Sequence, residues 1–163
     1  VLPSGQKSTI IGIDFAGESL EESFIGESVT LRLSDNIDVS RGDLIVAQES
    51  APELASTAEA TIAWLADTPL TDGARVLVKH GTKTVMGIVS SVLGKLDLDT
   101  GLTEPSQRLE LNDIGEVALT FAEPLPIEDY ARSRATGAFL LIDGQSGSTL
   151  AAGMAGTADR TRL

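Results

Sequence analysis

Few side chains in this sequence have the type and spacing that chemistry requires, and His80 is the first of them. It is the lone histidine, and it precedes Gly81 in a predicted turn. The chain has no second imidazole and no cysteine, which disfavours a metal role, so we expect a histidine at a hairpin end, hydrogen-bonded or in solvent. Asp97 and Asp99 offer two carboxylates, but the spacing of an EF-hand loop is absent. We interpret them as part of a solvated face.

The motifs of nucleotide binding and of hydrolysis are absent from the sequence. Gly94-Lys95 lacks both the preceding spacing and the following Ser or Thr of a phosphate-binding loop. There is no GxSxG, HExxH or GxGxxG pattern, and nothing singles out a Ser and an acid as partners of His80. Arg41-Gly42-Asp43 spells the integrin tripeptide, but we interpret it as a glycine turn. We predict that these residues alone catalyse no reaction and hold no cofactor or metal.

The charge balance excludes several classes of partner. The formal net charge is −12, from 24 acidic and 12 basic residues, which argues against nucleic acid and anionic membranes because phosphate groups require clustered Lys and Arg. No apolar run approaches the length of about 20 residues that a membrane helix needs. No signal peptide is visible, and the absence of cysteine excludes a disulfide scaffold. We expect a cytoplasmic protein, excised from a longer chain because it begins at Val1.

Short strands must position whatever function the chain has. The apolar run 138–142, flanked by Gly137 and by Asp143-Gly144, predicts a buried strand, and 149–154 predicts its hairpin partner. Alternating apolar residues predict further strands at 28–33, 74–80, 83–92 and 116–121, and 8–13 and 44–47 are also interpreted as strands. Residues 59–67 fit helical spacing as well as strand alternation; we favour a strand, with Trp64 in the core. We expect Glu123–Pro126 to end a strand and 127–133 to form one helical turn.

This rhythm of about ten to twelve short strands is typical of small β-barrels or sandwiches. The polar, proline-interrupted stretch 48–57 divides the chain into two modules. Residues 1–50 are few for an independent barrel, so we expect the first module to lack its opening strands. The predicted fold class is all-β, with two small antiparallel barrels of which the first is incomplete.

Six motifs, in order along nearly the whole chain, carry a resemblance to a known family. They are VLPSG at 1–5, IDVSRGDLIV at 37–46, HGTK at 80–83, LNDIGEVALTF at 111–121, PLPIEDYARSRATGAFLLID at 124–143 and AAGM at 151–154. Together they resemble the region that follows the GTPase domain in the large subunit of bacterial sulfate adenylyltransferase, a relative of elongation factors Tu and 1-alpha.

The resemblance implies an organisation and a function. Residues 1–50 would be the later part of the family's second domain, 57–155 its six-stranded third domain, and 156–163 a tail. In the family a GTPase domain drives the partner subunit's reaction, in which ATP and sulfate give adenosine 5′-phosphosulfate and pyrophosphate. GTP and Mg²⁺ would bind in that domain, which these residues do not include. The implied partners are the small catalytic subunit and the chain's own GTPase domain, with no nucleic acid and no membrane.

A polar-aromatic cluster before a core strand is the candidate contact with the catalytic subunit. It consists of Asp129, Tyr130 and Arg134, since such clusters often anchor interfaces. Alternatively, Asp129 and Arg134 pair with each other and merely hold the loop. Other interpretations are a translation-factor-type barrel pair that binds RNA or protein, and a free-standing binding module. An adenylylsulfate kinase domain follows in some relatives, and the tail is too short to show one.

Overall fold

The fold is given by a computed structural model that describes residues 1–156, so all but the first residue of the predicted tail 156–163 lies outside the described residues. Twelve strands, a short 3₁₀-helix η1 (Gln48–Ser50) and a four-residue helix α1 (Arg134–Gly137) make up the described elements. The predicted all-β class is therefore confirmed. Within the described residues, no helix has the length and apolarity needed to cross a membrane.

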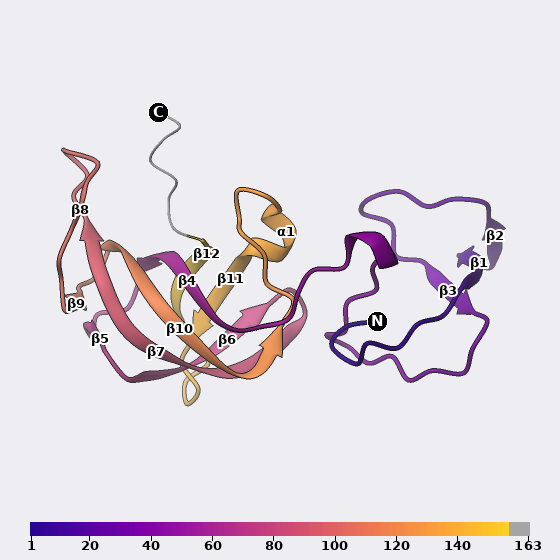
Figure 1. The fold of residues 1–163 in the computed structure, drawn as a ribbon, viewed down its shortest axis with the longest axis horizontal. Coiled ribbons are helices and arrows are strands. Elements are labelled where there is room, and N and C mark those ends of the chain that lie inside the picture. The colour runs from indigo at the N-terminus through magenta and orange to yellow at the C-terminus, as the bar shows by residue number, and fades with distance from the viewer. Residues whose placement is uncertain (157–163) are drawn as a thin grey trace.

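Six strands close into an antiparallel barrel in the second part of the chain (Figure 1). Their order is β10-β4-β12-β11-β6-β7, and β7 pairs again with β10. The bounds are β4 (Ala55–Trp64), β6 (Ala74–His80), β7 (Lys83–Leu96), β10 (Ile114–Leu125), β11 (Ala138–Ile142) and β12 (Thr149–Ala155). The short strand β8 (Thr103–Glu104) pairs with β7, and β5 (Leu70–Thr71) pairs with β9 (Arg108–Leu109).

Alternation along the strands builds the barrel core. Val76 and Val78 in β6 and Val85 and Val89 in β7 are all buried, as the period of two predicts. The ambiguous segment is a strand, β4, and its Trp64 is only 4% exposed, which confirms both expectations. The two hairpins predicted around 80–83 and 138–154 are also present.

The β11–β12 hairpin depends on one glycine and one aromatic ring. Phe139 in β11 lies opposite Gly153 in β12, and both are buried. A Cβ at Gly153 would overlap three atoms of the Phe139 ring. The ring therefore occupies the space that a side chain at position 153 would need, which explains why the AAGM segment carries glycine there.

The N-terminal module is a three-stranded antiparallel sheet of β1 (Ile10–Phe15), β2 (Glu18–Leu20) and β3 (Thr30–Leu33), in the order β2-β1-β3. No residue before Ala60 belongs to the described buried core. A hollow of about 950 Å³ opens instead, and apolar side chains such as Ile13, Leu31 and Leu33 line it. One open layer is what the prediction of an incomplete first barrel requires.

Two glycine turns shape the N-terminal module. One lies beside a bridge within the module, and the other packs against the barrel. Leu2 pairs with Leu44 in an isolated bridge, and Gly5, at φ +73°, completes the turn that VLPSG predicted. Gly42, at φ +100°, lies in a turn in which Asp43 accepts a hydrogen bond from the Ser40 amide at 2.8 Å. The Gly42 backbone packs against Lys83 at the tip of the β6–β7 hairpin. The Arg41-Gly42-Asp43 segment is thus a glycine turn, as interpreted.

Three predicted boundaries are wrong. Residues 44–47 form no strand: Leu44 makes one bridge to Leu2, and the rest are outside any described sheet. β10 does not end before Pro124, because its register with β4 shifts between Thr120 and Leu125 and leaves the proline without a ladder partner. Residues 127–133 contain turns, and the helical turn lies later, at Arg134–Gly137.

Gly153→Ala should lower the free energy of unfolding by about 1–3 kcal/mol, because the added methyl group collides with the buried Phe139 ring. Urea denaturation at equilibrium measures the change. Gly144→Ala is the matched control, since its new Cβ would meet Leu77 at an ordinary 3.8 Å. Adding Phe139→Leu to Gly153→Ala should recover part of the loss. Equal stability of the Gly153 and Gly144 variants would contradict this account of the hairpin.

Candidate interaction site

The loop between β10 and β11, residues 126–137, brings the three predicted contact residues together. Asp129 and Arg134 are exposed and Tyr130 is half-buried. The loop turns back on itself through hydrogen bonds from the Arg132 and Ser133 amides to the Asp129 carbonyl, each 3.0 Å long. α1 then begins at Arg134 and leads directly into β11. In Figure 1 this loop and α1 lie next to β11 and β12.

Backbone contacts on both sides clamp Tyr130 in place. Its amide donates to the Ala155 carbonyl at the end of β12, at 2.9 Å. A Cβ at Gly137 would overlap the Tyr130 backbone, and one at Gly156 would lie 2.8 Å from the Asp129 carboxylate. The two glycines therefore allow the loop to approach the barrel closely. The sequence offered Gly137 as a strand flank, but nothing in it indicated the packing at either glycine.

Thr136 is the centre of the loop's hydrogen bonds. Its carbonyl accepts from the Glu128 amide at 3.2 Å and from His80 Nε2 at 2.7 Å, so the Nε2 of this histidine carries the proton. Its hydroxyl donates to Glu128 Oε2 at 2.7 Å and lies 2.7 Å from the Ser133 hydroxyl. His80, 6% exposed, thus joins the β6–β7 hairpin to the loop. Of the two expectations for this hairpin-end histidine, hydrogen-bonded or in solvent, the first is the one the structure has, although the sequence did not identify the partner.

The alternative in which Asp129 and Arg134 pair with each other is wrong. Asp129 Oδ1 accepts instead from the Ala131 amide at 2.8 Å, and within residues 1–156 no ion pair joins it to Arg134. The loop's ion pair is between Arg132 and Glu128, whose Nε and Oε1 atoms are 3.6 Å apart. The guanidinium of Arg134 makes no ion pair within the described part of the chain.

The side chains of loop 126–137 are of the kinds that form contacts with another protein. Among residues 1–156, no cluster of three or more His, Cys, Asp or Glu side chains is placed to hold a metal ion. Asp97 accepts hydrogen bonds from the Asp99 and Thr100 amides at 2.8 and 2.9 Å, so it stabilises a turn. The hydrogen bond from the Thr100 amide, which has the larger effect, and that from the Asp99 amide hold the pKa of the Asp97 carboxyl below its ordinary value. A loop with an exposed cation, an exposed carboxylate and a half-buried phenol offers contacts of both polar and apolar character.

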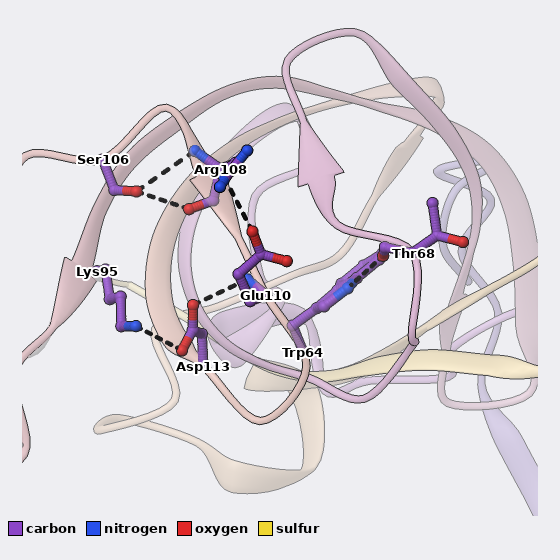
Figure 2. A network of polar contacts seen from close by, with 7 residues as sticks. All are labelled: Trp64, Thr68, Lys95, Ser106, Arg108, Glu110 and Asp113. Carbon is purple, nitrogen blue, oxygen red and sulfur yellow. Dashed lines mark hydrogen bonds and ion pairs between the residues drawn. The ribbon is translucent and has the colours of Figure 1, made fainter.

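A second polar network secures the other end of β10 (Figure 2). Asp113 receives Lys95 Nζ at 2.7 Å on one carboxylate oxygen and the Glu110 amide at 2.8 Å on the other. Glu110 in turn pairs with Arg108 at 2.9 Å. The Trp64 backbone joins the same turn, because its amide donates to the Asp113 carbonyl at 2.8 Å. This network fixes where β10 begins.

Two opposing influences set the acidity of Asp113. Burial raises the pKa of its carboxyl, but the hydrogen bond and charge of Lys95 and the hydrogen bond from the Glu110 amide together outweigh burial. The pKa therefore lies below the ordinary value of 3.8. The ionised form is the one that the fold stabilises.

Comparisons with known proteins agree with this architecture. Residues 57–155 match the family model described as "GTP-eEF1A C-terminal domain-like". The bifunctional enzyme CysN/CysC of Xylella fastidiosa is 39% identical over 153 residues, covering 94% of this chain and 25% of that protein. Sulfate adenylyltransferase subunit 1 of Methylorubrum extorquens is 38% identical over 157 residues, covering 96% of this chain and 34% of that protein. These relatives confirm the resemblance found in the six sequence motifs.

The crystal structure of sup35 complexed with GDP has the same fold over most of the chain. Its TM-score is 0.84 at 24% identity, and the match covers 96% of this chain and 39% of that one. At this identity the likeness concerns the fold alone. The chain spans about a quarter to a third of the length of the curated relatives reported above.

His80→Ala should lower the free energy of unfolding by about 1–3 kcal/mol, because the Thr136 carbonyl loses a buried donor. The substitution should also increase the rate of amide hydrogen exchange in residues 126–137 more than in β7. Lys79→Ala, one residue earlier and exposed, is the control that should leave both measurements unchanged. Unaltered exchange in the loop would mean that His80 does not hold it.

Asp113→Asn should destabilise the protein at pH 7, and the difference from the parent should shrink as the pH falls below about 3.8. The sign follows from the lowered pKa: the stabilisation is complete above the unfolded-state value and is lost as pH falls through the folded-state value. Urea unfolding between pH 2 and 7 measures it. Asp67→Asn, at an exposed position, is the control; a pH-independent difference for Asp113→Asn would refute the linkage.

Proposed function

The chain belongs to the GTP-eEF1A C-terminal domain-like family, and on this premise we propose that it is the C-terminal β-barrel region of the GTP-hydrolysing subunit of a sulfate adenylyltransferase. The observation that carries the proposal is the 38% identity to a sulfate adenylyltransferase subunit 1 over 96% of this chain. The match is not confined to the closed barrel, so it supports assigning residues 1–50 and 57–155 to two successive domains of that subunit.

The proposed role is docking and coupling in the cytoplasm. In the reaction, a sulfate oxygen attacks the α-phosphorus of ATP, and pyrophosphate leaves as adenosine 5′-phosphosulfate forms. Formation of this phosphosulfate anhydride has a strongly unfavourable free energy, so coupling it to GTP hydrolysis is chemically sensible. Such coupling needs a structural element with two conformations, and both the GTPase site and the catalytic subunit must shift the equilibrium between them. GTP and Mg²⁺ would bind in a GTPase domain outside these residues, and the barrels would transmit its state to the catalytic subunit.

Loop 126–137 is the proposed contact with the catalytic subunit. Asp129, Tyr130 and Arg134 lie in one loop, and the bond from Tyr130 to Ala155 fixes that loop to the barrel. Contacts on a preorganised loop lose less conformational entropy on binding than contacts on a free one. The Arg134 guanidinium has no ion-pair partner among residues 1–156, so it is available to a carboxylate of the other subunit.

Tyr130→Ala and Arg134→Ala should each weaken binding of the catalytic subunit by about tenfold or more, as expected for interface anchors. The assay is a pull-down, quantified by titration, of the small subunit encoded in the same genome. Arg108→Ala is the matched control, an exposed arginine in the polar network rather than in this loop. Thermal unfolding verifies that the variants remain folded. Unchanged affinity in both loop variants would remove these residues from the interface.

A further inference from the structure

Four neighbouring barrel strands contain no acidic residue, although the chain has 24. These strands, β12, β11, β6 and β7, are consecutive in the sheet. Acidic residues return on the flanking strands, as Glu59 in β4 and as Glu116 and Glu123 in β10. We call the outward side of the four strands the acid-free wall; its main exposed or half-buried members are Arg75, Leu77, Lys79, Met86, Ile88, Leu140, Ile142 and Met154.

Two cations flank an apolar side chain in the middle of this wall. Arg75, Leu77 and Lys79 alternate with the buried Val76 and Val78, so the three share the outer face of β6. Within residues 1–156, neither Arg75 nor Lys79 makes an ion pair. Their partners across the strands are uncharged as well.

The strand register places apolar groups around these cations. Arg75 lies opposite Ile88 on β7, and Leu77 lies between Met86 on β7 and Ile142 on β11. Lys79 lies between Thr84 and Leu140. The centre of the wall is therefore apolar, with a positive charge on each side along β6.

A shallow groove beside Arg75 adds shape to this pattern. It has a volume of about 270 Å³ and is lined by Arg75, Met86, Gly87, Ile88, Thr120, Phe121 and Ala122. Met86 and Ile88 stand at its sides, 60% and 41% exposed, while Gly87 between them faces the buried Val78 of the barrel core. A groove of this volume accommodates one aliphatic side chain.

We propose that the acid-free wall docks an extended polypeptide segment with carboxylates at positions i and i+4 and an apolar residue at i+2. Arg75 and Lys79 are four residues apart on one strand face, which is about 13 Å at the rise of a β-strand. An extended segment repeats that spacing, so both carboxylates meet a cation while the apolar side chain meets Leu77 and Met86. The chain's charge of −12 makes a local surface that attracts carboxylates distinctive.

The wall does not suit nucleic acid. Single strands bind through stacking on aromatic side chains, and the aromatic residues of the four strands, Phe139 and His80, are buried. Two unpaired cations would also neutralise too few phosphates for strong binding. The inference is independent of the proposed function, because it concerns a surface distinct from loop 126–137 and its test needs no second subunit.

The test is an NMR titration of the 163-residue chain with the capped pentapeptide Glu-Ser-Leu-Ser-Glu at concentrations up to millimolar. Amide shifts of Leu77, Met86 and Leu140 should move with a single saturating curve. Arg75→Glu combined with Lys79→Glu should weaken binding by at least about tenfold. The matched control is Lys7→Glu combined with Arg41→Glu, which changes the net charge equally at exposed positions in the N-terminal module.

Further peptides separate the two halves of the proposal. Lys-Ser-Leu-Ser-Lys should not bind, and Glu-Ser-Ser-Ser-Glu should bind more weakly because the apolar centre then stays uncovered. Absence of shifts on the wall with the acidic peptide would overturn the proposal. So would equal binding by the Arg75/Lys79 variant, or tighter, salt-dependent binding of a tRNA at the same residues.

Discussion

Closure of the barrel by β10 is the constraint on which the rest of the structure depends. This strand pairs with β4 along one edge and with β7 along the other, so it joins the two ends of what would otherwise be an open sheet. Register shifts at Glu116/Val117 and Ala118/Leu119 increase the local twist that closure needs. The polar network around Asp113 lies just before β10, and loop 126–137 follows it directly. A single strand therefore positions both ends of the barrel.

The sequence predicted the features that depend on alternation, because the period of side chains in a strand is independent of tertiary context. The β6–β7 and β11–β12 hairpins, the strand character of β4 and the burial of Trp64 belong to this group. The wrong boundaries are at positions where a partner far away in the sequence decides whether a segment pairs as a strand. Leu44 had no continuous neighbouring strand, and Pro124 was tolerated because the register shift left it outside the ladder.

The candidate site illustrates the same limit. The residue types in 126–137 suggested a contact cluster, and its three members do share one loop. What holds the loop, namely the bonds from Tyr130 to Ala155 and from His80 to Thr136, joins residues 25 and 56 positions apart. No local pattern encodes such pairs. Likewise the acid-free wall is invisible along the chain, because its two hairpins, β6–β7 and β11–β12, are separated by a long acidic stretch and come together only in the closed sheet.

The open three-stranded sheet has a consequence for the behaviour of the chain in solution. Unlike the closed barrel strands, β2 and β3 are edge strands and present backbone donors and acceptors to any strand that approaches. Phe24 and Ile25, highly exposed between them, would reinforce such contacts. Glu18, Glu21, Glu22 and Glu27 surround this segment, and their mutual repulsion between copies opposes strand addition. We therefore expect part of the acidic surplus to oppose self-association of the chain, and added salt or acid to weaken this repulsion.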